Sequence, residues 1–242
     1  MKPVKIYSKG ILFFVIDTVS LLVEGVIYFM SFLPMAFLLG HYAQSGFVAI
    51  LVVAIIGWLV ALIVFMLIII VLKRMMAPKV LFGRFLLSSN KMQSWFICDR
   101  LRRMAHRSFF WVFINDITPF RYYFLRGMGA QIDSSLILGQ HVYLLDPWSF
   151  SAGKNVLVGD GAMISGHMIN HEVVTVGRVE VGNNVLIGAH SLVAPGVKIG
   201  NDVTIAAQSA LPRGTVIPDG ETWAGSPAHR VDMRDVGQRM QS

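Results

Sequence analysis

The chain has 242 residues, of which 55% are hydrophobic and only 14% are charged. A soluble domain usually carries about 25% charged residues, so the composition argues against an ordinary soluble protein. The single cysteine, Cys98, excludes a disulfide framework within the chain and agrees with a reducing compartment.

Two apolar segments lie near the N-terminus. Residues 46–72 carry no charged side chain, and about 20 apolar residues are enough to span a bilayer core. Residues 11–40 form a second span, which is too long for the apolar core of a signal peptide. This span contains Asp17 and Glu24, seven positions apart on one helix face, and their role is left open. The sequence predicts a transmembrane hairpin as a first domain, residues 1–76.

Basic residues flank the two spans on one side only. The connection at residues 41–45 has no Lys or Arg, and positive charge marks the cytoplasmic side of a membrane protein. We therefore expect a multi-pass protein of the inner (cytoplasmic) membrane, with both termini and the rest of the chain in the cytoplasm. The flanking residues are Lys2, Lys5 and Lys9 before the first span, and Lys73, Arg74 and Lys79 after the second.

Residues 77–127 form a basic, aromatic linker. Residues 73–126 hold eleven basic and two acidic side chains, a net charge of +9. Helices of this composition lie in the membrane interface, where each basic residue gains about 1 kcal/mol from anionic lipid. We expect interfacial helices on an anionic lipid surface; a solvated helix is the alternative, and nucleic acid is not an expected partner. The interleaved aromatic residues are Trp95, Phe96, Phe109, Phe110, Trp111 and Phe113.

The second half of the chain is built from six-residue repeats. Eight hexads run without a gap from Val181 to Ala228, each opening with an apolar residue and six with Gly or Ala next. A fixed hexapeptide period is typical of a parallel β-helix. The pattern predicts an all-β domain over residues 128–231, followed by a tail, residues 232–242. Two earlier groups of three hexads open at Ile132, Leu138 and Leu144, and at Ala152, Val158 and Ile164.

The repeats are interrupted twice. A two-residue insertion falls within residues 147–151, and residues 170–180 lie out of register, which predicts a projecting loop. Interruptions of a solenoid usually map to its functional face. The chemistry is therefore expected beside these two breaks.

The register brings an imidazole and a carboxylate together. With three hexads in each coil, Leu144 and Ile164 stack about 4.8 Å apart, which places Asp146 beside His167 as a candidate dyad. Histidine can accept a proton from a hydroxyl at neutral pH, and a carboxylate would fix its tautomer. The alternatives are a solvent-facing corner histidine, an ordinary Asp-Pro turn, and Glu172 as the orienting acid.

Several stretches resemble one family. The coil sequence VEVGNNVLIGAHSLVAPGVKIGNDVTIAAQSAL and the ending WAGSPAHRV are similar to the hexapeptide-repeat, left-handed β-helix acyltransferases, which include serine, maltose and galactoside O-acetyltransferases. FRYYFLRGMGAQI, residues 120–132, resembles the entry to the β-helix domain that ends poly-lysine-synthetase-type nonribosomal peptide synthetases. The resemblance implies left-handed coils, a homotrimer with active sites between subunits, and acetyl-CoA as co-substrate without a required metal. The left hand follows from the resemblance alone, since it is an exception to the usual crossover rule.

The resemblance also implies site residues. Residues 165–167, SGH, match the position of the family's essential histidine, with Met168 where the family motif has proline. His171 is then a candidate for substrate contact. Small residues would line the pantetheine groove and basic residues would meet the nucleotide phosphates; the candidates are Gly188, Ala189, Ala206 and Ala207, and Arg213 and Arg230.

The function expected is a membrane-anchored acyltransferase. It would move an acetyl group from acetyl-CoA to a hydroxyl of a membrane-associated acceptor, such as a lipid-linked glycan, a glycolipid or a polymer precursor. A longer acyl-CoA, an acyl carrier protein donor and an amine acceptor stay open. The alternatives from other classes are a non-catalytic membrane scaffold trimer and a γ-class carbonic-anhydrase-like metal enzyme, with imidazoles from His141, His167, His171 and His190.

Overall fold

A computed structural model describes residues 10–231, with side chains described from residue 18 onward. The three N-terminal lysines, the side chain of Asp17 and the tail at residues 232–242 lie outside the described residues. The described chain forms two compact units. The first unit is residues 10–78 with Arg100–Phe113, and the second is Lys79–Asp99 with residues 114–231. The predicted linker thus contributes residues to both units.

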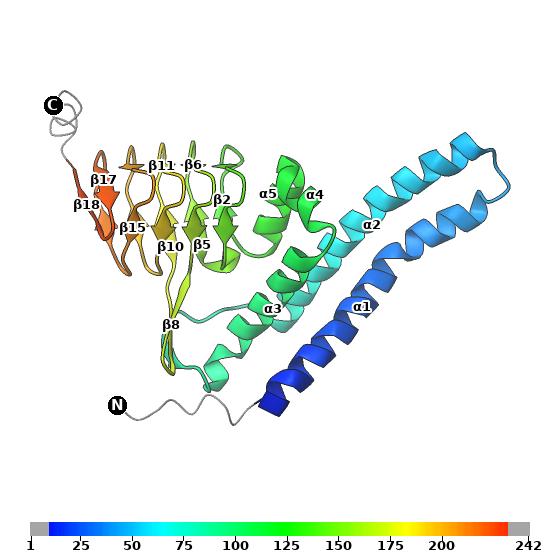
Figure 1. Cartoon of the computed structure of the whole chain (residues 1–242), viewed down its shortest axis with the longest axis horizontal. Helices are drawn as coiled ribbons and strands as arrows, with labels where there is room; N and C mark the ends of the chain where they lie inside the picture. Colours follow the sequence, from blue (N-terminus) through cyan, green and yellow to red (C-terminus); the bar gives the residue numbers. More distant parts are fainter. Residues whose placement is uncertain (1–9, 232–242) are drawn as a thin grey trace. The chain divides into compact units, whose positions relative to one another are not determined.

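The first unit is helical. Its long helices α1 (Gly10–His41) and α2 (Phe47–Met76) pack against each other (Figure 1). Gly57 of α2 permits a close approach, because a Cβ there would lie 2.8 Å from the Met35 side chain. Residues Thr18–His41 and all of α2 are long and apolar enough to be candidate membrane spans. The unit also contains the second half of α3 (Gln93–Arg107) and the first residues of α4 (Trp111–Asp116).

Aromatic rings join the helices of this unit. Tyr28 of α1 stacks on Phe65 of α2 with ring centroids 5.6 Å apart, and on Phe109 at 5.5 Å. Phe110 lies 5.1 Å from Phe65 and is fully buried. Phe110, one of the aromatic residues of the predicted interfacial linker, thus packs inside the helical unit against the long helices.

The second unit is a parallel β-helix, whose coils follow one another from green to red in Figure 1. Three sheets form its sides. The five-stranded sheet contains β2 (Gln131–Ile132), β5 (Phe150–Ala152), β10 (Val179–Val181), β13 (Lys198–Ile199) and β16 (Val216–Ile217). The six-stranded sheet contains β3 (Ile137–Leu138), β6 (Leu157–Val158), β11 (Leu186–Ile187), β14 (Thr204–Ile205), β17 (Thr222–Gly225) and the antiparallel β18 (Ala228–Arg230). The four-stranded sheet contains β4 (Tyr143–Leu144), β7 (Met163–Ile164), β12 (Leu192–Val193) and β15 (Ala210–Leu211).

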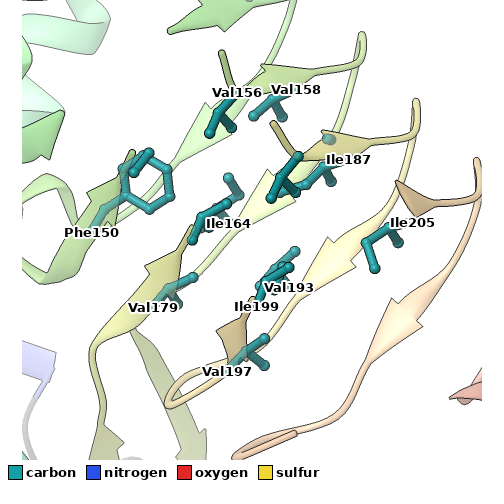
Figure 2. Packing of buried hydrophobic residues seen from close by; sticks show 14 of the residues in the cluster. Phe150, Val156, Val158, Ile164, Val179, Ile187, Val193, Val197, Ile199 and Ile205 are labelled. Atoms are coloured by element: carbon teal, nitrogen blue, oxygen red, sulfur yellow. The ribbon is translucent and has the colours of Figure 1, made fainter. Parts of the chain in front are cut away.

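The hexad period sets this architecture through alternating burial. In β11, Leu186 faces outward and Ile187, which opens the next hexad, is fully buried. Aliphatic residues from successive coils stack in this way into one continuous core (Figure 2). The pairing of Leu144 with Ile164 confirms the predicted register of three hexads in each coil.

The two interruptions have defined structures. The two-residue insertion is accommodated by a short helix, η3 (Pro147–Ser149). The projecting segment is a β-hairpin of β8 (His167–Asn170) and β9 (Val173–Val176). Strand β1 (Gly83–Leu86), from the linker, pairs antiparallel with β9 and completes a three-stranded sheet. The linker was expected to be helical, and it holds this strand in addition to η2 (Asn90–Met92), α3, α4 and α5 (Thr118–Gly127).

Candidate active site

A buried carboxylate lies where the repeat is first interrupted. Asp146 follows β4 and precedes η3, and it is only 1% exposed. Its Oδ1 accepts a hydrogen bond from Trp95 Nε1 at 3.0 Å, and its Oδ2 accepts one from the Gly166 amide at 2.8 Å. The side chain makes no capping hydrogen bond to η3. The carboxylate is therefore committed to tertiary contacts, while the backbone carbonyl of Asp146 accepts from the Ser149 amide at 2.9 Å and closes a turn at Asp146-Pro147.

The imidazole predicted for this site contacts that carboxylate. His167 begins β8, and its Nδ1 lies 2.6 Å from Oδ2 of Asp146. An ionised carboxylate can only accept, so Nδ1 carries the proton and Nε2 keeps its lone pair. The His167 side chain is 16% exposed, which leaves the ring partly open to solvent. The pair has the geometry of a general base with an orienting carboxylate.

The local sequence SGH explains how the histidine is presented. A Cβ at Gly166 would collide with the Ser149 hydroxyl, so glycine is required where this amide approaches Asp146. The Ser165 hydroxyl donates to the carbonyl of His167 at 2.7 Å. The Gly177 amide donates to the Gly166 carbonyl at 2.8 Å and closes the base of the hairpin. These contacts fix the backbone on both sides of the imidazole.

Trp95 completes this site, and the sequence analysis did not identify it as a site residue. It is 3% exposed and its ring centroid lies 4.7 Å from that of His167 in an edge-to-face arrangement. The hexad pattern carries no information on Trp95, because α3 lies outside the repeats. Its spacing with Met92 and Cys98, both buried, was the available signal of an inward-facing stripe. A buried tryptophan usually needs a partner for its N–H, and here the partner is Asp146.

His171 lies at the tip of the hairpin, away from the pair. It is exposed, has a left-handed backbone with φ of 55°, and its ring contacts the Asn170 side chain. It lies four positions after His167, a distance of about 13 Å along β8. Glu172, the alternative orienting acid, binds the Leu87 amide through its backbone carbonyl. Neither residue joins the Asp146–His167 pair.

The two arginine candidates differ in position. Arg213 follows β15 and donates to the Thr175 hydroxyl of β9 at 3.2 Å. It therefore lies on the hairpin side of the β-helix, at the same corner as His167. Arg230 is an exposed residue that forms an ion pair with Glu221 at 3.4 Å.

The small-residue candidates occupy another corner. Gly188 and Ala189 follow β11, and Ala206 and Ala207 follow β14, so all four lie between the six-stranded and four-stranded sheets. His167 follows β7, at the corner after the four-stranded sheet. A Cβ at Gly188 would lie 2.3 Å from the Ala207 amide, so coil stacking alone requires glycine there. Within one chain, these residues and His167 therefore face different edges of the β-helix.

The side chains described from residue 18 to 231 contain no cluster of three His, Cys, Asp or Glu residues that could hold a metal ion. His141 and His190, the other two imidazoles considered for a metal, are exposed at left-handed corner positions.

In the comparison with known protein families, the matching residues lie within the six-residue repeats. Residues 178–213 match the family described as Bacterial transferase hexapeptide (six repeats). Over these residues the β-helix is therefore similar to the hexapeptide repeats of bacterial transferases. The match begins after the Asp146–His167 pair and ends at residue 213, within the uninterrupted hexads, so it concerns the scaffold and not the site.

Individual proteins similar to this chain differ in how much of it they match. Galactoside O-acetyltransferase of Escherichia coli (strain K12) is 30% identical over 82 residues, which cover 31% of this chain and 40% of the relative. Delta-poly-L-ornithine synthetase of Acinetobacter baumannii (strain AB307-0294) is 21% identical over 162 residues, 67% of this chain and 12% of the relative. The chain thus spans well under half of either relative. A crystal structure of a maltose O-acetyltransferase from Clostridium difficile 630 aligns at 18% identity with a TM-score of 0.46, over 66% of this chain and 96% of that chain.

Proposed function

We propose that the protein is a membrane-anchored acyltransferase that moves an acetyl group from acetyl-CoA to a hydroxyl. The observation that carries the proposal is the 2.6 Å contact between His167 Nδ1 and the buried Asp146 carboxylate, which leaves Nε2 as a base. The hexapeptide match and the similarity to a galactoside O-acetyltransferase support acyl transfer as the reaction class.

The reaction needs one base that later returns its proton. His167 Nε2 takes the proton of the acceptor hydroxyl while that oxygen attacks the thioester carbonyl carbon. The tetrahedral intermediate then collapses, the C–S bond breaks, and the imidazolium returns its proton to the leaving CoA sulfur. Asp146 stabilises the imidazolium between the two transfers, and a positioned base of this kind contributes roughly 10²- to 10⁴-fold to the rate.

The donor site is proposed at a subunit interface. The corner with Ala206 and Ala207 would form the pantetheine groove, with Gly188 and Ala189 one coil below. In a homotrimer of left-handed β-helices, this corner of one subunit would face the His167 corner of the next. Arg213 would contact the nucleotide phosphates from the hairpin side, where its bond to Thr175 holds it. Arg230 would make a second phosphate contact, and His171 would reach the acceptor from the hairpin tip.

The acceptor is proposed to be held at the membrane. The two candidate spans would anchor the protein in the cytoplasmic membrane, with the hexapeptide domain in the cytoplasm. A lipid-linked glycan, a glycolipid or a polymer precursor would then meet the site without diffusing through bulk solvent. A local supply of this kind raises the effective concentration of the acceptor.

The test uses the full chain purified in detergent, with radiolabelled acetyl-CoA and membranes from cells that lack the protein. Label should enter an extractable lipid or glycan, and His167→Ala should reduce that transfer by roughly 10²- to 10⁴-fold. His141→Ala is the matched control, because His141 is an exposed imidazole at another corner. Full transfer by His167→Ala would contradict the mechanism, and no transfer by the unaltered protein with any donor would favour a scaffold.

A further inference from the structure

The helical unit contains a basic cavity that the proposed acyl transfer does not use. Its volume is about 530 Å³ and it opens to the surface. None of its described lining residues is acidic. One lining residue, Leu21, belongs to α1, and the others come from the second half of α3: Arg100, Arg102, Arg103, His106 and Arg107. We refer to this feature as the arginine cavity.

The helix sequence explains why these side chains gather on one side. Arg100, Arg103 and Arg107 recur at intervals of three and four residues and so share a helix face. Leu101 and Ala105, both buried, lie on the other side of the helix. The helix dipole accounts for cations only in the last turn, so Arg100 and Arg103 are not explained as stabilisers of the α3 terminus.

The wall formed by α1 is held in place by an ion pair. Arg107 Nη2 lies 3.0 Å from Glu24 Oε2, and the Glu24 side chain is only 12% exposed. Glu24 is the acidic residue whose role in the first span the sequence left open. Its contact joins α1 to the basic face of α3 at the edge of the cavity. Glu24 therefore fixes Arg107 in place while Arg100, Arg102 and Arg103 line the remaining wall.

The apolar wall of the cavity continues into the surface of the candidate span. Leu21 is 61% exposed, and the neighbouring Leu22 is 67% exposed on the same helix. Exposed leucines on a span are suited to acyl chains, whereas guanidinium groups bind phosphate oxygens through paired hydrogen bonds. The cavity thus places phosphate-binding groups directly beside a surface suited to hydrocarbon.

We propose that the arginine cavity binds the phosphate group of an anionic membrane phospholipid, with its acyl chains lying along Leu21 and Leu22 of α1. The volume fits a headgroup together with its phosphate, and the charge selects against zwitterionic lipid. The site would fix the depth of α3 at the membrane surface. This inference does not depend on acyl transfer, because neither Asp146 nor His167 contributes to the cavity.

The test measures lipid binding by the full chain in neutral detergent. Dioleoyl phosphatidylglycerol is titrated, bound lipid is counted by native mass spectrometry, and dioleoyl phosphatidylcholine is the comparison. The double variant Arg100→Gln/Arg103→Gln should weaken phosphatidylglycerol binding at least about tenfold, the factor expected for one lost charge-assisted hydrogen bond. The control is Arg84→Gln/Lys91→Gln, which removes the same net charge from exposed positions outside the cavity and should bind as the unaltered chain does.

Each other outcome overturns the site. Equal weakening by the two double variants would show unspecific attraction between opposite charges, and equal affinity for phosphatidylcholine would show that the phosphate is not selected by charge. If millimolar inorganic phosphate displaces bound phosphatidylglycerol as effectively as added lipid does, the cavity binds a soluble phosphate and not a lipid. If the double variant fails to fold in a thermal melt, the single variant at the exposed Arg103 carries the same test.

Discussion

The indole N–H of Trp95 donates to Oδ1 of Asp146 at 3.0 Å, while Oδ2 of the same carboxylate contacts His167 Nδ1. One carboxylate thus joins a helix outside the repeats to the candidate base within them. Trp95 also packs edge-to-face on the imidazole. It is a positioning residue, because it acts on the candidate base through Asp146 and through ring packing.

Trp95→Phe should keep the ring contact with His167 and remove the hydrogen bond to Asp146. We expect kcat for acetyl transfer to fall about tenfold, since a hydrogen bond to a charged group contributes about 1.5–3 kcal/mol, with KM for acetyl-CoA unchanged. Trp148→Phe is the control, because the indole N–H of this buried neighbour has no hydrogen-bond partner among the described residues. Equal losses of kcat in the two variants would indicate that Trp95 contributes to packing and does not position the Asp146 carboxylate.

Asp146→Asn should strongly reduce kcat while leaving the stability of the fold almost unchanged. The amide keeps the shape of the side chain but cannot stabilise an imidazolium, so we expect kcat to fall roughly 10²- to 10⁴-fold. Asp146→Ala should in addition destabilise the fold, since the buried N–H groups of Trp95 and Gly166 each lose an acceptor at about 1–3 kcal/mol. Kinetics and thermal melts of both variants separate the two effects. Normal kcat in Asp146→Asn would remove the carboxylate from the mechanism.

Co-expression of two inactive variants tests whether the site is shared between subunits. His167→Ala removes the candidate base, and Ala207→Trp fills the proposed groove from an exposed position on another corner. In randomly mixed trimers, roughly a quarter of the interfaces pair an intact His167 with an intact groove, so about that fraction of activity should return. Mixed oligomers with no activity would show that each chain holds its own complete site.

The hexapeptide coils should not accept a side chain at Gly188. A Cβ there would lie 2.3 Å from the Ala207 amide, and backbone of the next coil cannot yield as a flexible side chain would. Gly188→Val should therefore destabilise the domain by about 1–3 kcal/mol, as overpacking does. Circular dichroism melts measure the loss, with Val216→Ala as an outward-facing control. An unchanged Tm for Gly188→Val would mean that coil spacing can relax.

Lipid binding at the arginine cavity should strengthen as the pH falls. Burial, and secondarily the charge of Arg102, lower the pKa of His106 from its ordinary value of 6.5, because both disfavour the charged ring. Arg100, Arg103 and Arg107 also line this cavity, Trp111 packs on the ring, and Glu24 pairs with Arg107. A bound phosphate favours the imidazolium, so affinity for phosphatidylglycerol should rise between pH 7.5 and 5.5.

His106→Gln should abolish that rise while keeping the binding at pH 7.5. Phosphatidylglycerol titrations at the two pH values measure it, because the lipid phosphate does not change charge in this range. A rise that persists in His106→Gln would assign the titration to another group.

The sequence by itself determined the coils. An apolar residue every sixth position is a local signal, and burial of that residue in each short strand is enough to set the stacking of Leu144 on Ile164 and the meeting of Asp146 with His167. The two long apolar helices were equally predictable, because length and hydropathy alone make a helix a candidate membrane span. Both predictions rest on patterns that repeat along neighbouring residues.

Only the tertiary structure decided what surrounds these patterns. Trp95 reaches Asp146 across 51 positions, and Arg107 reaches Glu24 across 83. Strand β1 joins the hairpin from a linker in which no period-two pattern marked a strand. Contacts of this kind form once, between segments far apart in the chain, so no periodicity records them. They depend on how separate elements pack, and that packing supplies the hydrogen bond behind the candidate base and the walls of the arginine cavity.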